Sequence, residues 1–201
     1  EDLEKILKEL TSSVDRSTRI INHLREFGRK SDDTMITTDI NQVILNAVSL
    51  MGKQLESKSI ICELDLDSSI PKMLGNANRL EQVFLNLLVN SRDAIIGKRD
   101  FGMDAPGDSD TDFIRIQSAC DDKNVIVLFT DSGPGIVDQV KTKIFEPFFT
   151  TKKSGEGTGL GLAISYQIVR DHKGSIEVSN AETGGAMFKL TFPAQPAGDW
   201  I

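Results

Sequence analysis

TTKKSGEGTGLGLAIS, residues 150–165, places four glycines at every second position and then continues into a run that predicts a helix. Free backbone N–H groups and the helix dipole favour an anion at such a helix N-terminus, so the stretch predicts a phosphate site. Several unrelated folds build a phosphate site in this way. The neighbouring sequence therefore has to identify which kind of site is present.

Two common phosphate motifs do not fit. A P-loop requires a glycine, four residues and then Gly-Lys-Ser/Thr, and no Gly-Lys pair of this chain is followed by a hydroxyl residue. The dinucleotide fingerprint requires G-x-G-x-x-G directly after a strand. Here the glycines of residues 155–161 alternate as G-x-G-x-G-x-G, and FEPFFTTKK precedes them. Both motifs are excluded.

A second glycine pair ends a strand-like run. FTDSGPGI, residues 129–136, contains Asp131, Gly133 and Gly135. A carboxylate at a strand end can accept a hydrogen bond from the exocyclic amine of adenine, where guanine would present an oxygen. The glycines let the backbone approach a flat base closely. A simple strand-to-loop turn can have the same pattern.

A polar pair lies on the helix predicted over residues 78–96. Asn86 and Asn90 are four residues apart, so they share one strip beside the face that the leucines bury. Asparagine is a mediocre helix former, so the pair requires a reason. It is either a solvated helix edge or a set of oxygen ligands for Mg²⁺, which prefers hard oxygen donors together with substrate phosphates.

Taken together, these stretches resemble the sensor histidine kinases of two-component signalling, whose ATP domain shares a superfamily with gyrase, mismatch-repair ATPases and heat-shock chaperone ATPases. LNLLVN resembles the N box, DSGPGI the first glycine box, FEPFFTTK the phenylalanine box and GEGTGLGLAIS the second glycine box. The four motifs follow the family order, and the resemblance covers residues 34–193. The phenylalanine box separates the kinases from the other members.

The resemblance implies a site for ATP and Mg²⁺. It assigns Mg²⁺ to Asn90, with Asn86 assisting, and the adenine amine to Asp131. Residues 136–157 would form a lid, which carries four lysines against two acidic residues between residues 138 and 153. The other residues that it assigns to ATP are Gly133, Gly135, Ile136, Lys152, Gly157, Thr158, Gly159, Leu160 and Gly161.

One position departs from the family pattern. Many of these kinases have a lysine three residues after the second N-box asparagine, where this chain has Asp93 beside Arg92. Either the lid lysines or Arg92 must then supply the positive charge for the phosphates.

The resemblance also separates a kinase from an ATPase. The ATPase branches have a glutamate four residues before the Mg²⁺-binding asparagine, and this chain has Asn86 there, whose amide cannot take a proton from water. We therefore expect a histidine kinase, whose γ-phosphate goes to a histidine on a dimerisation helix and then to a response-regulator receiver domain. The alternatives are an ATPase of the superfamily and a nucleotide-binding signalling module without phosphotransfer.

The first residues predict a different element. An apolar stripe over residues 2–28 predicts a long bundle-type helix, and GRKSDD, residues 28–33, ends it. Residues 1–32 resemble the second dimerisation helix, which implies a homodimer of the full protein, and residues 33–201 the catalytic ATP-binding domain. His23 lacks the acidic neighbour and the proline of a phosphoacceptor. His172 is interpreted as structural, with a partly positive imidazole that suits the dipole at the C-terminus of its helix. The acceptor histidine is therefore expected to be absent, so the chain alone should not phosphorylate itself.

The remaining pattern predicts an α+β fold. Helices over residues 38–55, 78–96 and 159–172 are mixed with five strands without a β-α-β rhythm, which favours a two-layer sandwich of a mixed sheet and three helices. The run 97–112, rich in glycine, aspartate and proline, is predicted to be a mobile surface loop and not a site.

Composition limits the function classes. The 201 residues carry a formal net charge of −7, which argues against a nucleic-acid partner. We find no signal-peptide pattern and no apolar run of membrane-spanning length, and two lone cysteines lie in strand-like runs. We expect a cytoplasmic location, and we leave open a membrane anchor upstream, because the chain begins within a helical pattern without an initiator Met.

Overall fold

The computed structural model describes residues 34–101, 111–152, 157–182 and 184–194. The predicted dimerisation helix, residues 1–32, and the boundary that follows it lie outside these residues, as do His23 and the glycine-box residue Gly155. The homodimer and the division into domains therefore stay predictions.

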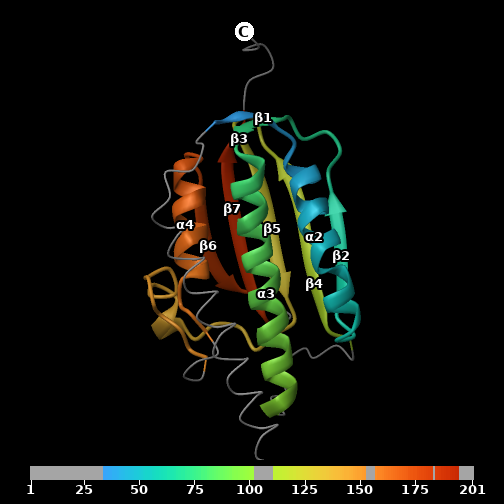
Figure 1. Ribbon diagram of the computed structural model, residues 1–201, viewed down its shortest axis with the longest axis vertical. Coiled ribbons are helices and arrows are strands. Elements are labelled where there is room, and N and C mark those ends of the chain that lie inside the picture. Colours follow the sequence, from blue (N-terminus) through green and yellow to red (C-terminus); the bar gives the residue numbers. More distant parts are fainter. Residues whose placement is uncertain (1–33, 102–110, 153–156, 183, 195–201) are drawn as a thin grey trace, which may run out of the picture.

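The described residues form two layers, with three helices on one face of a five-stranded sheet (Figure 1). The strand order is β2-β4-β5-β7-β6, with β2 parallel to β4 and the other neighbours antiparallel. This confirms the predicted sandwich. The helices are α2 (Ile40–Glu56), α3 (Ala77–Phe101) and α4 (Gly161–Asp171). The strands are β2 (Ile61–Leu66), β4 (Phe113–Cys120), β5 (Asn124–Asp131), β6 (Ser175–Asn180) and β7 (Ala186–Pro193).

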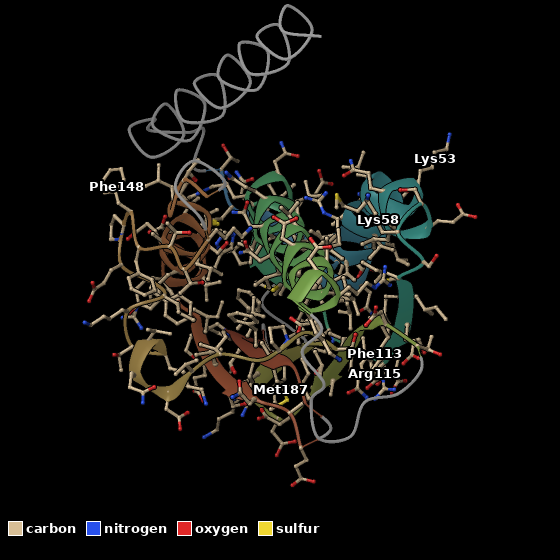
Figure 2. All side chains as sticks on the ribbon, turned by 90° about the horizontal axis from the view of Figure 1, so that it is seen from below. Lys53, Lys58, Phe113, Arg115, Phe148 and Met187 are labelled. Atoms are coloured by element: carbon tan, nitrogen blue, oxygen red, sulfur yellow. The ribbon has the colours of Figure 1, made fainter. Side chains whose placement is uncertain are left out.

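The core lies between the helices and the sheet. β5 alternates buried and half-buried residues along its whole length, as a strand with one covered face should. The buried positions are Val125, Val127, Phe129 and finally Asp131. α3 packs on this face through the predicted residues Leu80, Val83, Phe84, Leu87, Leu88 and Ile95. The strand register therefore points the carboxylate of Asp131 into the interior. On the other face of the sheet Figure 2 shows Phe113, Arg115 and Met187.

Three features differ from the sequence prediction. A small antiparallel sheet of β1 (Ile36–Thr38) and β3 (Met73–Gly75) was missed, because strands of three residues carry almost no periodic signal. α4 begins at Gly161 and not at Gly159, because Gly159 has a φ of 66° and cannot continue a right-handed helix. A short 3₁₀ turn, η1 (Asp138–Val140), lies in the predicted lid.

The predicted loop 97–112 is also wrong in its first five residues, because α3 continues to Phe101. Tertiary contacts stabilise this extension. The Lys98 ammonium donates to the carbonyl oxygen of Ser132 at 3.3 Å. The Arg99 guanidinium pairs with Asp112 and donates to the carbonyl oxygens of Lys58 and Ser59. The sequence shows these charges but not their partners.

His172 is structural, but not in the ionisation state that the sequence suggested. It is buried at the end of α4, and its Nε2 accepts the backbone N–H of Asn76 at 2.9 Å. Its Nδ1 lies 2.7 Å from the carbonyl oxygen of Ile168 and donates to it. Burial lowers the pKa of His172. The ring is therefore neutral, and the partly positive imidazole expected at the helix dipole is wrong.

Replacing Asp39 by alanine should destabilise the domain by about 1 kcal/mol. Asp39 caps α2, because its carboxylate accepts the backbone N–H groups of Asn41 and Gln42 at 3.0 and 3.2 Å. Asp39→Asn keeps an accepting oxygen and should stay within a few tenths of a kcal/mol of the wild type. Urea denaturation measures both variants. Equal stability of Asp39→Ala and the wild type would contradict the capping role.

Candidate nucleotide site

Asp131 is the buried acid of the site, and its side chain has one acceptor position left. Its Oδ1 accepts the backbone N–H groups of Gly133 and Ala186 at 2.9 and 3.1 Å. Its Oδ2 accepts the hydroxyl of Ser91, from α3, at 2.8 Å. A carboxylate has about four lone-pair positions, so Oδ2 can accept one further donor. An exocyclic amine of a base is such a donor.

Burial raises the pKa of Asp131, while the three hydrogen bonds from Ala186, Ser91 and Gly133 favour the charged form and oppose the rise. The acid is therefore more costly to ionise in the folded protein than in water. A ligand that donates to Oδ2 would make its charged form more favourable.

Glycines at two positions, Gly133 and Gly185, let the chain pass close to Asp131, and Gly135 lies against the side chain of Asn180. A Cβ on Gly133 would lie 2.9 Å from the Asp131 Oδ1 and 3.2 Å from the Cβ of Ala94. A Cβ on Gly185 would lie 1.7 Å from the carbonyl oxygen of Asp131, and Gly185 has a φ of 85°. Gly135 has a φ of 75°. Gly133 and Gly135 were predicted from the sequence, but Gly185 was not, because its position is that of an ordinary hairpin glycine.

Asn180 and Ser91 are two polar residues of this region that the sequence analysis also missed. The Oδ1 of Asn180 accepts the N–H of Ile136 at 2.8 Å, and its Nδ2 donates to the carbonyl oxygen of Ile136 at 3.0 Å. Asn180 therefore fixes the backbone of the predicted base-lining residues Gly135 and Ile136. Its place at the end of a strand was the only available signal, and many strand ends carry asparagine.

The two N-box asparagines differ in their contacts. The Nδ2 of Asn86 donates to the carbonyl oxygen of Gly161 at 3.1 Å and to the hydroxyl of Ser165 at 3.2 Å. Asn86 thus joins α3 to the first turn of α4, and its Oδ1 accepts no hydrogen bond from a described residue. Asn90, one turn further along α3, is half-buried and forms no side-chain hydrogen bond with another described residue.

The second glycine box leads into the N-terminus of α4, where no described side chain caps the first N–H groups. Leu160 is buried at the start of this helix. The hydroxyl oxygen of Thr158 accepts the N–H of Leu160 at 3.4 Å. A Cβ on Gly159 would lie 2.4 Å from the carbonyl carbon of Phe148, so only glycine fits there. The next N–H groups of the helix remain available for an anion.

Phe148, in the phenylalanine box, is fixed against this glycine. Its N–H donates to the carbonyl oxygen of Gly159 at 2.8 Å, and its φ is 67°. The side chain is 67% exposed and projects from the molecule in Figure 2. The backbone of the lid segment and that of the second glycine box are therefore joined directly.

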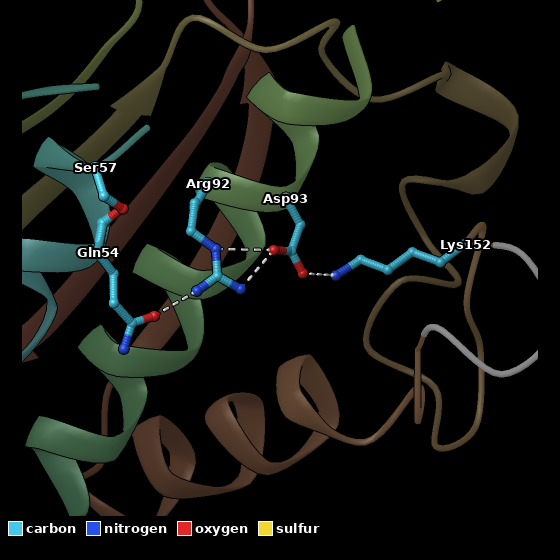
Figure 3. Close-up of polar contacts among 5 residues, drawn as sticks. All are labelled: Gln54, Ser57, Arg92, Asp93 and Lys152. Atoms are coloured by element: carbon cyan, nitrogen blue, oxygen red, sulfur yellow. Dashed lines mark hydrogen bonds and ion pairs between the residues drawn. The ribbon is translucent and has the colours of Figure 1, made fainter. Parts of the chain in front are cut away.

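The ammonium of Lys152 contacts α3 through Asp93. Its Nζ is 2.6 Å from the Oδ2 of Asp93, and the guanidinium of Arg92 donates to the Oδ1 of the same carboxylate (Figure 3). A Cβ on Gly157 would meet the Lys152 side chain at 3.3 Å and the Thr150 hydroxyl at 2.5 Å. The residue that departs from the family pattern is thus paired with a predicted phosphate ligand.

Predicted site residues therefore meet α3 at three points, Asp131 at Ser91, Gly161 at Asn86 and Lys152 at Asp93. Within the described ranges, no group of three or more histidine, cysteine, aspartate and glutamate side chains could hold a metal ion. The amide oxygens of the asparagines remain the candidate ligands. No helix in the described part of the chain combines the length and apolarity that crossing a membrane requires.

The sequence matches a known family of ATP-binding proteins. The model of the histidine kinase-, DNA gyrase B- and HSP90-like ATPase family matches residues 75–196. The chain belongs to this family. Its relatives place it with the catalytic domains of sensor histidine kinases of two-component systems, as the four motifs predicted.

Three relatives illustrate the match. The two-component sensor PprA of Pseudomonas aeruginosa is 36% identical over 193 residues, which is 95% of this chain and 20% of PprA. The catalytic domain of histidine kinase ThkA is 29% identical with a TM-score of 0.66, over 81% of this chain and 99% of that one. ShkA, solved with AMPPNP, is 22% identical with a TM-score of 0.76, over 98% of this chain and 40% of that one, and it supports the fold alone.

ThkA has also been solved in complex with the response regulator TrrA. That ThkA chain is 26% identical with a TM-score of 0.74, and the match covers 98% of this chain and 53% of that one. The histidine kinase domain described here thus spans only part of its full-length relatives.

Proposed function

We propose that this domain binds Mg-ATP and donates the γ-phosphate to a histidine on a dimerisation helix, from which it passes to an aspartate of a response-regulator receiver domain. The observation that carries the proposal is the single remaining acceptor position of Asp131. It lies among glycines that allow a flat base to approach, and it selects a donor. Adenine has an amine at its edge where guanine has an oxygen, so the site prefers ATP to GTP.

The phosphate end of the proposed site lies at α4 and α3. The N–H groups that begin α4 would bind phosphate oxygens, as helix N-termini do. The Oδ1 atoms of Asn90 and Asn86 would hold Mg²⁺, since Asn90 is uncommitted and Asn86 uses only its Nδ2 within the fold. Two amide oxygens are few ligands for Mg²⁺. They suit an ion whose remaining ligands are phosphate oxygens and water. The ion would neutralise phosphate charge during transfer.

The chain favours a histidine over water as the acceptor. In the transfer, the P–O bond between the β and γ phosphates breaks as the N–P bond to the histidine forms, and ADP leaves. Hydrolysis would need a base to accept a proton from water, and Asn86 occupies the family position of that base. Its amide cannot accept the proton. The residue thus stabilises the start of α4 without activating water.

The partners of the proposal follow from the family. ThkA was crystallised with a response regulator, and ShkA with an ATP analogue. By similarity we propose a receiver domain as the partner of this protein, a homodimer through the helix predicted over residues 1–32, and a cytoplasmic location, where ATP is available.

Calorimetric titration with ATP and GTP, with and without Mg²⁺, tests the proposal. We expect ATP to bind at least tenfold more tightly than GTP, because a buried acceptor that meets an oxygen loses its hydrogen bond. Labelled ATP should then transfer its γ-phosphate to a supplied dimerisation-helix polypeptide that carries the acceptor histidine. Binding without transfer would favour the signalling module, rapid phosphate release into water would favour the ATPase, and equal affinity for GTP would contradict the adenine assignment.

A further inference from the structure

A chain of three charged side chains joins α2, α3 and the lid segment. Figure 3 shows Gln54 of α2, Arg92 and Asp93 of α3, and Lys152 in one line. The Nη1 of Arg92 donates to the Oε1 of Gln54 at 2.7 Å, and its Nε and Nη2 donate to the Oδ1 of Asp93 at 3.0 and 2.6 Å. The Nζ of Lys152 donates to the Oδ2 of Asp93 at 2.6 Å. Each oxygen of Asp93 therefore holds one cation.

Asp93 lies on the same face of α3 as the two N-box asparagines. Asp93 follows Asn90 by three residues and Asn86 by seven, so the three side chains form one row along α3. The ion pair brings the ammonium of Lys152, 59 residues away in the sequence, to the end of this row. Asn86 at the other end contacts the first residue of α4.

The three charged side chains are only partly solvated. The exposed fractions are 29% for Asp93, 32% for Lys152 and 22% for Arg92. Burial raises the pKa of Asp93, but the hydrogen bonds and charges of Lys152 and Arg92 outweigh it and hold the pKa below its ordinary value. Asp93 is therefore ionised at neutral pH, and the cluster of Arg92, Asp93 and Lys152 has one net positive charge.

We propose that Asp93 is a positioning residue, which holds the ammonium of Lys152 beside Asn90 so that it binds the phosphates of the nucleotide. This role rests on the function proposed above. A lysine ammonium has three N–H donors and Asp93 accepts one, which leaves two for phosphate oxygens. Arg92 is anchored on Gln54 and offsets the charge of Asp93, so the carboxylate fixes the lysine without making the site negative.

A positioning role and a competing role of Asp93 predict opposite changes in ATP affinity, so an experiment can distinguish the two roles. If Asp93 only competed with the phosphates for Lys152, or repelled them, its neutralisation would strengthen ATP binding. If Asp93 positions Lys152, neutralising Asp93 lets the long side chain of Lys152 regain its rotational freedom. Binding ATP must then order this side chain again, so the affinity for ATP decreases. Adenosine lacks phosphates, and its affinity should be unchanged in either case.

The experiment measures ATP and adenosine affinities of the wild-type chain and of Asp93→Asn by calorimetry. We expect Asp93→Asn to bind ATP about fivefold more weakly, as the loss of a partly buried ion pair implies. Asp93→Glu should recover most of the affinity, since a carboxylate again reaches Lys152. Combined with Lys152→Ala, the asparagine substitution should cause no further loss. Glu63→Gln is the matched control, because its ion pair with Arg115 lies on the far side of the sheet.

Each outcome distinguishes the two proposals. A wild-type chain that does not bind ATP would overturn the proposed function and this role together. A wild-type chain that binds ATP, with an Asp93→Asn variant that binds it equally or more tightly, would overturn this role alone. Thermal unfolding of every variant checks that the substitution has not unfolded the domain, and failure of Asp93→Glu to recover affinity would also count against the role.

Discussion

Asp131→Asn should weaken ATP binding about ten- to hundredfold, while the nucleotide-free protein keeps its stability or gains some. The amide keeps an oxygen for the N–H groups of Gly133 and Ala186, and its nitrogen can donate to the hydroxyl of Ser91. The second N–H of that nitrogen then points where the adenine amine would donate. Two donors face each other, so ATP binding weakens without disruption of the fold.

The expected gain in stability follows from the sign of the pKa shift. Burial raises the folded-state pKa of Asp131 above the unfolded value, which is about 3.9. The folded state then holds its proton more tightly than the unfolded state, so this group's contribution falls as pH rises from the unfolded pKa through the folded one. An asparagine cannot ionise, and the variant should lack this fall.

Thermal unfolding as a function of pH, together with calorimetric ATP titration, measures both effects. Asp171→Asn is a suitable control, because its carboxylate pairs with Arg79 at the opposite end of α4 from the glycine box. It should leave ATP affinity unchanged. An Asp131→Asn variant with wild-type ATP affinity would remove Asp131 from the site, and a large loss of stability at neutral pH would contradict the inference from its burial.

Gly185→Ala should destabilise the domain by more than about 3 kcal/mol, since it combines backbone strain with overlap. The φ of 85° is one that alanine adopts only with strain, and the new Cβ would lie 1.7 Å from the carbonyl oxygen of Asp131. That oxygen belongs to the backbone of β5, so it cannot rotate away as a side chain would. The β6–β7 turn must move, and the contact of Asp131 with the N–H of Ala186 goes with it.

Gly52→Ala is the matched control. Gly52 lies within α2, and a Cβ there would have no atom within 4 Å. Alanine should stabilise the helix by about 0.5–1 kcal/mol, because glycine loses more conformational freedom on folding. Urea denaturation of both variants gives the comparison. If the two variants have the same stability, the close approach of Gly185 to β5 is not what requires a glycine.

The local sequence pattern was sufficient to predict helices and strands whose buried face repeats along the sequence. The alternation of β5 and the apolar face of α3 predicted their elements and buried sides, since burial of one face imposes a period on a sequence. Boundaries depended on more distant contacts. The last five residues of α3 appeared as loop because Lys98 and Arg99 have their partners elsewhere in the chain. The start of α4 differs from the prediction because Gly159 has a φ of 66°, and its carbonyl oxygen accepts the N–H of Phe148.

The same division applies to the site. Asp131, the glycines of the two boxes and the pair of asparagines could be named from the sequence, because their spacing is local and their chemistry follows from residue type. Ser91, Asn180 and Gly185 could not, since each acts on a segment that only folding brings near. The role of Asp93 belongs to this second group. In the sequence it is an acid where a cation was expected. Only the tertiary structure pairs it with Lys152. The electrostatic effect of a charged side chain depends on the charges around it, and these come from distant parts of the sequence.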